Sequence, residues 1–157
     1  MSPSKLGTEA WLLLGISSIP GALLLKAGQL SFTAQGTGSA WPWQLRKLER
    51  RMGRQGLAAA VDAGQATLVF DWPASEVGAW CPWYYFGGGI KISRSQATLR
   101  ISFGEPAHMK LRAHQGHPGG VLREAAAQLH TVGVMRSRGK LWQAALKEHA
   151  RPRQRDV

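Results

Sequence analysis

Three histidines with metal-compatible spacing lie in a Pro/Gly-rich stretch at residues 104–120. His108, His114 and His117 form a His-x5-His-x2-His series. Imidazole nitrogens bind transition metals, but a closed site usually shows further recognisable ligands. No cysteine or carboxylate is interleaved with these histidines, and histidines also gather harmlessly in such loops. We therefore expect no metal site and no other cofactor.

Nucleophiles and paired acids are scarce. Cys81 is the only cysteine, and its neighbours, a tryptophan and a proline, supply no base, so a packed thiol is expected. Asp62, Asp71 and Glu76 are the acids nearest the predicted sheet, and their spacing does not show two that would share acid and base roles. The common hydrolase, metalloprotease and nucleotide-binding patterns are missing from the sequence. We expect a binding protein rather than an enzyme, although an active site assembled from distant segments would leave no such pattern.

The overall charge favours an anionic partner. The chain has 157 residues, with 20 Lys and Arg against 9 Asp and Glu, and a formal net charge of +11. A field of this sign attracts acidic lipid surfaces, acidic proteins or nucleic acid, and simple solubility is the alternative. Length and a hydrophobic share of 44% predict one folded domain.

A basic amphipathic helix is predicted at residues 41–53. Its apolar stripe has spacings of four, three and four, and comprises Trp41, Leu45, Leu48 and Met52. Its other faces carry Arg46, Lys47, Arg50, Arg51 and Arg54. With Trp43 near its start, the helix has the composition of a segment that lies in a membrane interface. The alternative is a surface helix that packs its stripe on the sheet and presents a solvated basic face.

A second group of aromatic side chains precedes a run of glycines. The group comprises Trp80, Trp83, Tyr84, Tyr85 and Phe86. It either covers the core or forms a partly exposed platform for a partner. The glycines at 87–89 lack the Lys-Ser/Thr pair and the following helix of a phosphate-binding loop. We expect them to bend the backbone into the next strand.

Alternation of apolar and polar residues predicts an antiparallel sheet over residues 66–103. Strands are expected at 67–70, 90–92 and 99–103. The apolar stretch 10–27 is interrupted at its centre and is shorter than the roughly 20 apolar residues of a membrane span. It predicts two buried strands with a turn at 18–21, the second followed by a hairpin into 30–34. A membrane-embedded segment is the alternative.

Residues 57–61 are predicted to continue the preceding helix or to form a short second one, and a further helix is predicted at 120–130, with a break at 131–134 and a last helix from Ser137 to about residue 149. The last helix is expected to pack four side chains on the sheet: Leu141, Trp142, Ala145 and Leu146. The predicted organisation is a loose terminus at 1–9, one domain at 10–149 and a basic disordered tail at 150–157.

Several motifs occur in a familiar order. A strand is followed by Asp-Trp-Pro, by Pro-Trp-Tyr-Tyr-Phe-Gly-Gly-Gly-Ile-Lys-Ile, and then by a short turn and Leu-Arg-Ile-Ser-Phe. An apolar strand and Gly-Gln-Leu-Ser-Phe at 28–32 come before them, and a helix closes the chain. This order resembles bacterial members of the pleckstrin-homology-like (PH-like) superfamily, in particular the GRAM-like proteins. The resemblance extends over residues 12–146 with an insertion at 41–61, and it implies a lipid- or protein-binding module with no catalytic residues.

The sequence thus predicts a mainly β (α+β) fold, an antiparallel PH-like partly open barrel or sandwich with an inserted amphipathic helix and closing C-terminal helices. We expect a binding module that docks on an anionic membrane surface or on a membrane-associated protein. Its expected location is the cytoplasm, and the docking hypothesis would place it peripherally on the inner face of the membrane. The alternatives are a structural subunit of a larger assembly and, with less support, a nucleic-acid binder, for which no recognition motif is present. The expected contacts are Trp41, Trp43, Arg46, Lys47, Arg50, Arg51, Arg54, Trp83, Tyr84, Tyr85 and Lys91.

Overall fold

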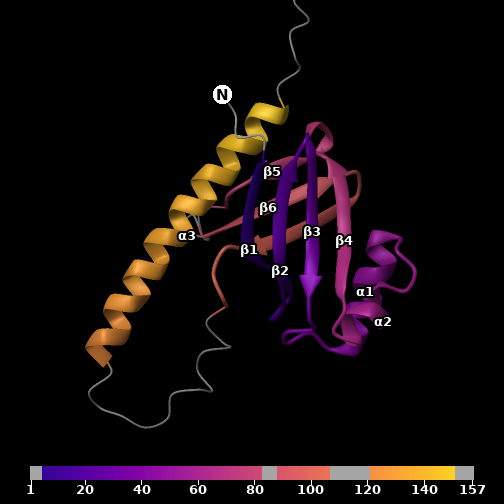
Figure 1. Cartoon of the computed structure of the whole chain (residues 1–157), viewed down its shortest axis with the longest axis horizontal. Helices are drawn as coiled ribbons and strands as arrows, with labels where there is room; N and C mark the ends of the chain where they lie inside the picture. Colours follow the sequence, from indigo (N-terminus) through magenta and orange to yellow (C-terminus); the bar gives the residue numbers. More distant parts are fainter. Residues whose placement is uncertain (1–4, 83–87, 107–120, 151–157) are drawn as a thin grey trace, which may run out of the picture.

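The main element of the fold is a seven-stranded antiparallel sheet (Figure 1). The computed structural model describes residues 5–82, 88–106 and 121–150, and only the backbone of residues 121–132. The strands are β1 Lys5–Leu14, β2 Ser17–Lys26, β3 Gln29–Gln35, β4 Ala66–Pro73, β5 Gly78–Trp80, β6 Gly89–Arg94 and β7 Ala97–Ser102. Their order is β4-β3-β2-β1-β7-β6-β5, so in the described part of the chain β4 and β5 are edges and the sheet is not closed. The antiparallel sheet predicted from the sequence is confirmed.

Strand β1 joins the two halves of the sheet. It pairs with β2 along its whole length but with β7 only at Trp11, Leu12 and Leu13. In Figure 1, β1–β4 run side by side and β6 crosses behind them. The twist of the strands therefore folds the sheet over itself, and the inner faces of its two halves enclose one core.

The turn of the first hairpin differs from the prediction. β1 and β2 are joined at Gly15 and Ile16, not at residues 18–21. Gly15 has a φ of +66°, which glycine adopts without steric cost. Pro20 lies within β2, and it is tolerated there because the β2–β3 ladder begins only at Gly21. Pro20, which was predicted to lie in a turn, thus lies in a strand, at a position that is paired with β1 but not with β3.

The rest of the N-terminal region forms strands. The apolar stretch 10–27 lies in β1 and β2, and the hairpin into β3 is confirmed. β1 begins at Lys5, so residues 5–9 belong to the sheet and not to a loose terminus. Among the described residues, no helix has the length and apolar character needed to cross a bilayer.

The core is filled by alternate strand residues. Leu12, Ile19, Leu23 and Phe32 are completely buried. The Phe70 ring stacks on Phe32 with centroids 6.4 Å apart, and on the ring of Trp72 at 4.4 Å. Burial of large apolar side chains of this kind is the main stabilising contribution to such a domain.

Two short helices are inserted between β3 and β4: α1, Pro42–Met52, and α2, Leu57–Asp62. α1 was predicted, and of the two alternatives for residues 57–61 the structure has the short second helix. Gly53 ends α1 in the left-handed conformation at φ 63°. Leu45 and Leu48 are buried in the core, so this part of the predicted stripe packs as expected. Trp41 does not join it and is 63% exposed, because it is the extended N-cap residue.

The C-terminal helix α3, Val121–Ala150, is continuous, so the predicted break at 131–134 is wrong. Ser137 does not cap a new helix; its Oγ donates a hydrogen bond of 3.0 Å to the Gly133 carbonyl oxygen within the same helix. α3 packs on β5, β6 and the short 3₁₀ helix η1, Ala74–Glu76. Trp142 is completely buried and stacks on Phe103 at 6.2 Å, whereas Leu141, also expected on the sheet, is 51% exposed.

We predict that Trp142→Ala will lower the free energy of unfolding by about 3–5 kcal/mol, because it leaves a cavity between α3 and the sheet. Leu141→Ala is the matched control, because the neighbouring side chain points outward and its loss should cost less than about 0.5 kcal/mol. Urea unfolding followed by circular dichroism measures both. Equal effects of the two substitutions would show that α3 does not close the core.

Candidate functional site

Helix α1 lies between two surface clefts. The first, which we call the Trp43 cleft, has a volume of about 360 Å³ and lies between the β1–β2 turn, α1 and β7. It is lined by Leu13, Leu14, Gly15, Trp43, Gln44, Lys47, Leu48, Arg51, Thr98 and Arg100. The second, the arginine cleft, has a volume of about 430 Å³ and lies between the end of α1, β4 and the β6–β7 hairpin. Arg51 lines both, so α1 forms a wall that the two clefts share.

A buried glutamine fixes the start of α1 against the sheet. Gln44 Nε2 donates a 2.9 Å hydrogen bond to the Leu14 carbonyl oxygen, and its Oε1 accepts one of 2.9 Å from the Trp41 N–H. The Gln44 side chain is only 7% exposed. Because both ends of the amide group are used in a buried setting, the position of the helix start relative to the β1–β2 turn is well determined.

Three large hydrophobic side chains are exposed around this junction. Ile16 is 86% exposed at the tip of the β1–β2 turn, and Trp41 and Trp43 are 63% and 56% exposed at the start of α1. We call Ile16, Trp41 and Trp43 the hydrophobic rim. Single exposed apolar residues are ordinary, but a group of them on two linked elements indicates a binding surface.

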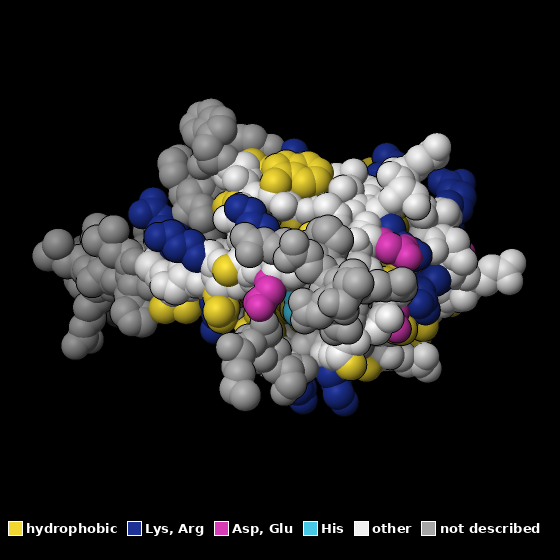
Figure 2. Space-filling model, turned by 90° about the horizontal axis from the view of Figure 1, so that it is seen from above, with side chains coloured by type: hydrophobic (Ala, Val, Ile, Leu, Met, Phe, Trp, Pro, Cys, Tyr) yellow, Lys and Arg dark blue, Asp and Glu magenta, His cyan; other side chains and the backbone are white. Residues whose placement is uncertain are grey.

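Cations accompany the rim. Arg46, Lys47, Arg50 and Arg51 are exposed on α1. The acid of this helix, Glu49, is half-buried and accepts a 2.9 Å hydrogen bond from the Ala58 N–H, which ties it to the α1–α2 junction. Lys and Arg also recur over the face shown in Figure 2, where acidic side chains are few. Positive charge is therefore spread over this face, and what distinguishes the α1 surface is that two exposed tryptophans and the exposed Ile16 accompany its cations.

The outer face of the sheet extends this surface. Directly paired residues of antiparallel strands point to the same face, and the pairs place Trp80, Lys91, Arg100 and Leu13 in one row from β5 to β1. Leu13 and Arg100 also line the Trp43 cleft. The predicted contact Lys91 is thus on β6, directly paired with the cleft residue Arg100 of β7.

The structure divides the predicted set of contacts. Trp43, Lys47 and Arg51 line the Trp43 cleft, whereas Arg54 lines the arginine cleft. Arg46 and Arg50 are exposed on α1 outside both clefts. Three predicted contacts fall outside the described residues: Trp83, Tyr84 and Tyr85.

Sequence reasoning missed Ile16 and Arg100. Ile16 was predicted to lie in a strand because the turn was placed at 18–21. Gly15, directly before Ile16, was the sequence signal that could have placed the turn correctly. Arg100 alternates with two buried residues of β7, so its outward direction followed from the period of the strand. Arg94, which lines the arginine cleft, has no comparable sequence signal.

The described residues that could act as nucleophile, acid, base or metal ligand do not form a group. Cys81 is half-buried, and its Sγ donates to the Gly89 carbonyl oxygen at 3.1 Å. Glu76 pairs with Arg94, while Asp62 and Asp71 are exposed. Within the described ranges there is no group of three or more His, Cys, Asp and Glu residues that could hold a metal ion. The predicted histidine series His108, His114 and His117 lies outside those ranges.

No family model, no curated protein and no solved structure matches the chain. The PH-like resemblance therefore stays a prediction. What the geometry defines is a hydrophobic rim set on a basic surface and held to the sheet by Gln44.

We predict that Gln44→Ala will destabilise the protein by about 1–3 kcal/mol, because the part-buried Leu14 carbonyl oxygen and the Trp41 N–H lose their partner. The Trp41 amide hydrogen should also exchange faster with solvent. Lys47→Ala, an exposed change one turn away, should affect neither quantity. Unchanged stability and exchange in Gln44→Ala would mean that the core contacts of Leu45 and Leu48 position α1 without this link.

Proposed function

We propose that this chain is a non-catalytic, PH-like binding module that docks on anionic membrane surfaces through the hydrophobic rim. The observation that carries the proposal is the exposure of Trp41 and Trp43, at 63% and 56%, on a helix whose outward faces are basic. The strand order and the C-terminal helix that packs on the sheet support the PH-like part of the proposal.

The rim suits the boundary between lipid headgroups and acyl chains. Indole rings combine a large apolar surface with a polar N–H, and they favour this boundary. Ile16 adds an aliphatic side chain at the tip of a turn. Partial burial of three such groups would contribute on the order of 1 kcal/mol each, by the usual scaling with apolar area.

The surrounding cations suit acidic headgroups. Each Lys or Arg near an anionic bilayer contributes about 1 kcal/mol at physiological salt. Arg46, Lys47, Arg50 and Arg51 are exposed beside the tryptophans, and Arg100 lies in the adjoining cleft. Attachment would combine insertion with charge, and neither contribution would suffice for stable binding by itself. On this proposal the protein is cytoplasmic and peripheral on the inner face of the membrane.

Flotation with neutral and anionic liposomes tests the docking proposal. We expect the wild-type protein to float with anionic vesicles only, and to continue to float when duplex DNA is added as a competitor. The double variant Trp41→Ala and Trp43→Ala should lose most of the binding while keeping its fold. Leu141→Ala, another exposed hydrophobic, is the control and should bind normally.

Charge is tested separately with two triple variants of equal net charge. Changing Arg46, Arg50 and Arg51 to Ala should weaken binding at least about tenfold, from the expected contribution of each cation. The control triple variant changes the following residues of α3 to Ala: Arg138, Lys140 and Lys147. Equal weakening in both would show nonspecific attraction, and loss of flotation with DNA would favour a nucleic-acid partner. A failure of the wild type to float at low salt would refute the proposal.

A further inference from the structure

The two edges of the sheet differ in how far they are covered. β5 has three residues and packs against α3. β4 has eight residues, from Ala66 to Pro73, and in the described part of the chain its ladder is with β3 alone. α2 packs against β4 but does not pair with it. An edge strand presents a row of unpaired N–H and C=O groups, which can pair with another extended chain.

The arginine cleft lies along this open edge. Four successive residues of β4, Val69 to Trp72, line one wall. At about 3.3 Å per residue, this wall is about 13 Å long. The β6–β7 hairpin forms the opposite wall with Arg94 and Ala97, and Arg54 comes from the segment that follows α1. The cleft is therefore elongated along a strand edge.

We propose that an extended, acidic segment of another protein binds in the arginine cleft by adding a strand to the edge of β4. Backbone hydrogen bonds to β4 would hold the segment, as in other cases of strand addition. Pro73 has no N–H, so the added ladder would end before it. This surface is separate from the hydrophobic rim, and the inference goes beyond the proposed membrane docking.

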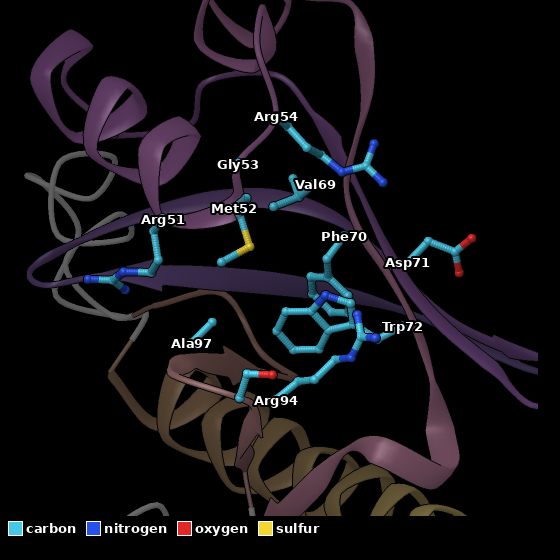
Figure 3. A pocket seen from close by; sticks show the side chains of 11 residues that line it. Arg51, Met52, Gly53, Arg54, Val69, Phe70, Asp71, Trp72, Arg94 and Ala97 are labelled. Atoms are coloured by element: carbon cyan, nitrogen blue, oxygen red, sulfur yellow. The ribbon is translucent and has the colours of Figure 1, made fainter.

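Charge at the cleft fits an acidic ligand. Arg51, Arg54 and Arg94 line it, against the single acid Asp71. In Figure 3 the Asp71 carboxylate points away from the aromatic rings of the cleft. Arg94 is held in place by Glu76, with its Nε 2.7 Å from the Glu76 Oε2. A guanidinium carries five N–H donors, so donors remain for a ligand carboxylate.

The floor of the cleft fits the side chains of an extended segment. Phe70 and Trp72 are 1% and 9% exposed and stack on one another there. Alternate residues of a strand point to opposite faces, so apolar residues could lie over this floor while acidic ones face the arginines.

The placement of the arginines favours a segment over a single small anion. In Figure 3 the side chains of Arg54 and Arg94 lie on either side of the Phe70 and Trp72 rings, and Arg51 points away from both. A phosphate ion would be bound tightly only if the guanidinium groups converged on it. Carboxylates spaced along a chain can meet such separated cations.

The test uses a fluorescein-labelled peptide, Glu-Val-Glu-Thr-Glu-Val-Glu, with binding measured by fluorescence anisotropy at low salt. The double variant Arg54→Ala and Arg94→Ala should weaken binding by about tenfold or more, as expected for loss of charge-assisted contacts. Asp71→Asn should strengthen it by about twofold to fivefold, because repulsion of the carboxylates is removed. Arg138→Ala with Lys140→Ala makes the same change in net charge elsewhere and should leave binding unchanged.

Modified peptides test strand addition without changing the protein. N-methylation of one alternate set of residues should abolish binding, because that set hydrogen-bonds to β4, whereas N-methylation of the other set should be tolerated. Bound peptide should also slow amide hydrogen exchange at those residues of 69–72 whose N–H groups point away from β3. Equal tolerance of both methylated peptides would overturn the proposal, as would equally strong displacement by inorganic phosphate, which would indicate a small-anion site.

The two proposals fail separately. The Trp41→Ala and Trp43→Ala double variant should bind the peptide normally, and the Arg54→Ala and Arg94→Ala variant should still float with anionic vesicles. If anionic vesicles displaced the peptide and the tryptophan variant lost both activities, one surface would serve both, and the separate strand-addition site would be refuted.

Discussion

The architecture depends on a short ladder between β1 and β7. Three pairs, centred on Leu12 opposite Ile101, join the four-stranded half of the sheet to the three-stranded half. Both of these residues are completely buried. With so few pairs the two halves can splay, and the edges β4 and β5 remain unpaired in the described part of the chain. The helices then pack where the sheet does not close, α1 between β1, β4 and the β6–β7 hairpin, and α3 against β5 and β6.

The positions of the two clefts follow from the short β1–β7 ladder. The Trp43 cleft begins at Leu13 and Arg100, which form the last pair of the β1–β7 ladder. The arginine cleft lies where β4 faces the β6–β7 hairpin without pairing with it. α1 separates the two, and its buried residues Leu45 and Leu48 contribute to the core. The same helix therefore contributes buried side chains to the core and exposed side chains to both clefts.

Local patterns predicted most elements of the fold but few of its long-range relations. Alternation identified the strands around Ile90 and Leu99, and the four-three-four spacing identified α1, because these signals depend only on which face is buried. The turn at Gly15 was misplaced because Pro20 is a strong local turn signal. Its tolerance in β2 depends on where β3 begins to pair, which no local pattern reveals. The false break in α3 has a similar cause, since Ser137 can cap a helix or bond within one. For the site, the basic helix was predictable from composition, but its link to Leu14 was not. Gln44 and Leu14 are 30 positions apart, and only the folded chain brings them together.

The fixed attachment of α1 also bears on the entropy of any binding that it mediates. Many interfacial helices are disordered in solution and fold only on the membrane, so ordering opposes their binding by about 1–2 kcal/mol for each backbone residue. The 11 residues of α1 are already ordered by the core and by the Gln44 bridge. A ligand of this surface meets a preorganised shape, so little of the interaction energy is lost in ordering the helix. A rigid attachment also fixes the orientation of the whole sheet relative to whatever α1 binds, which a flexible tether would leave free.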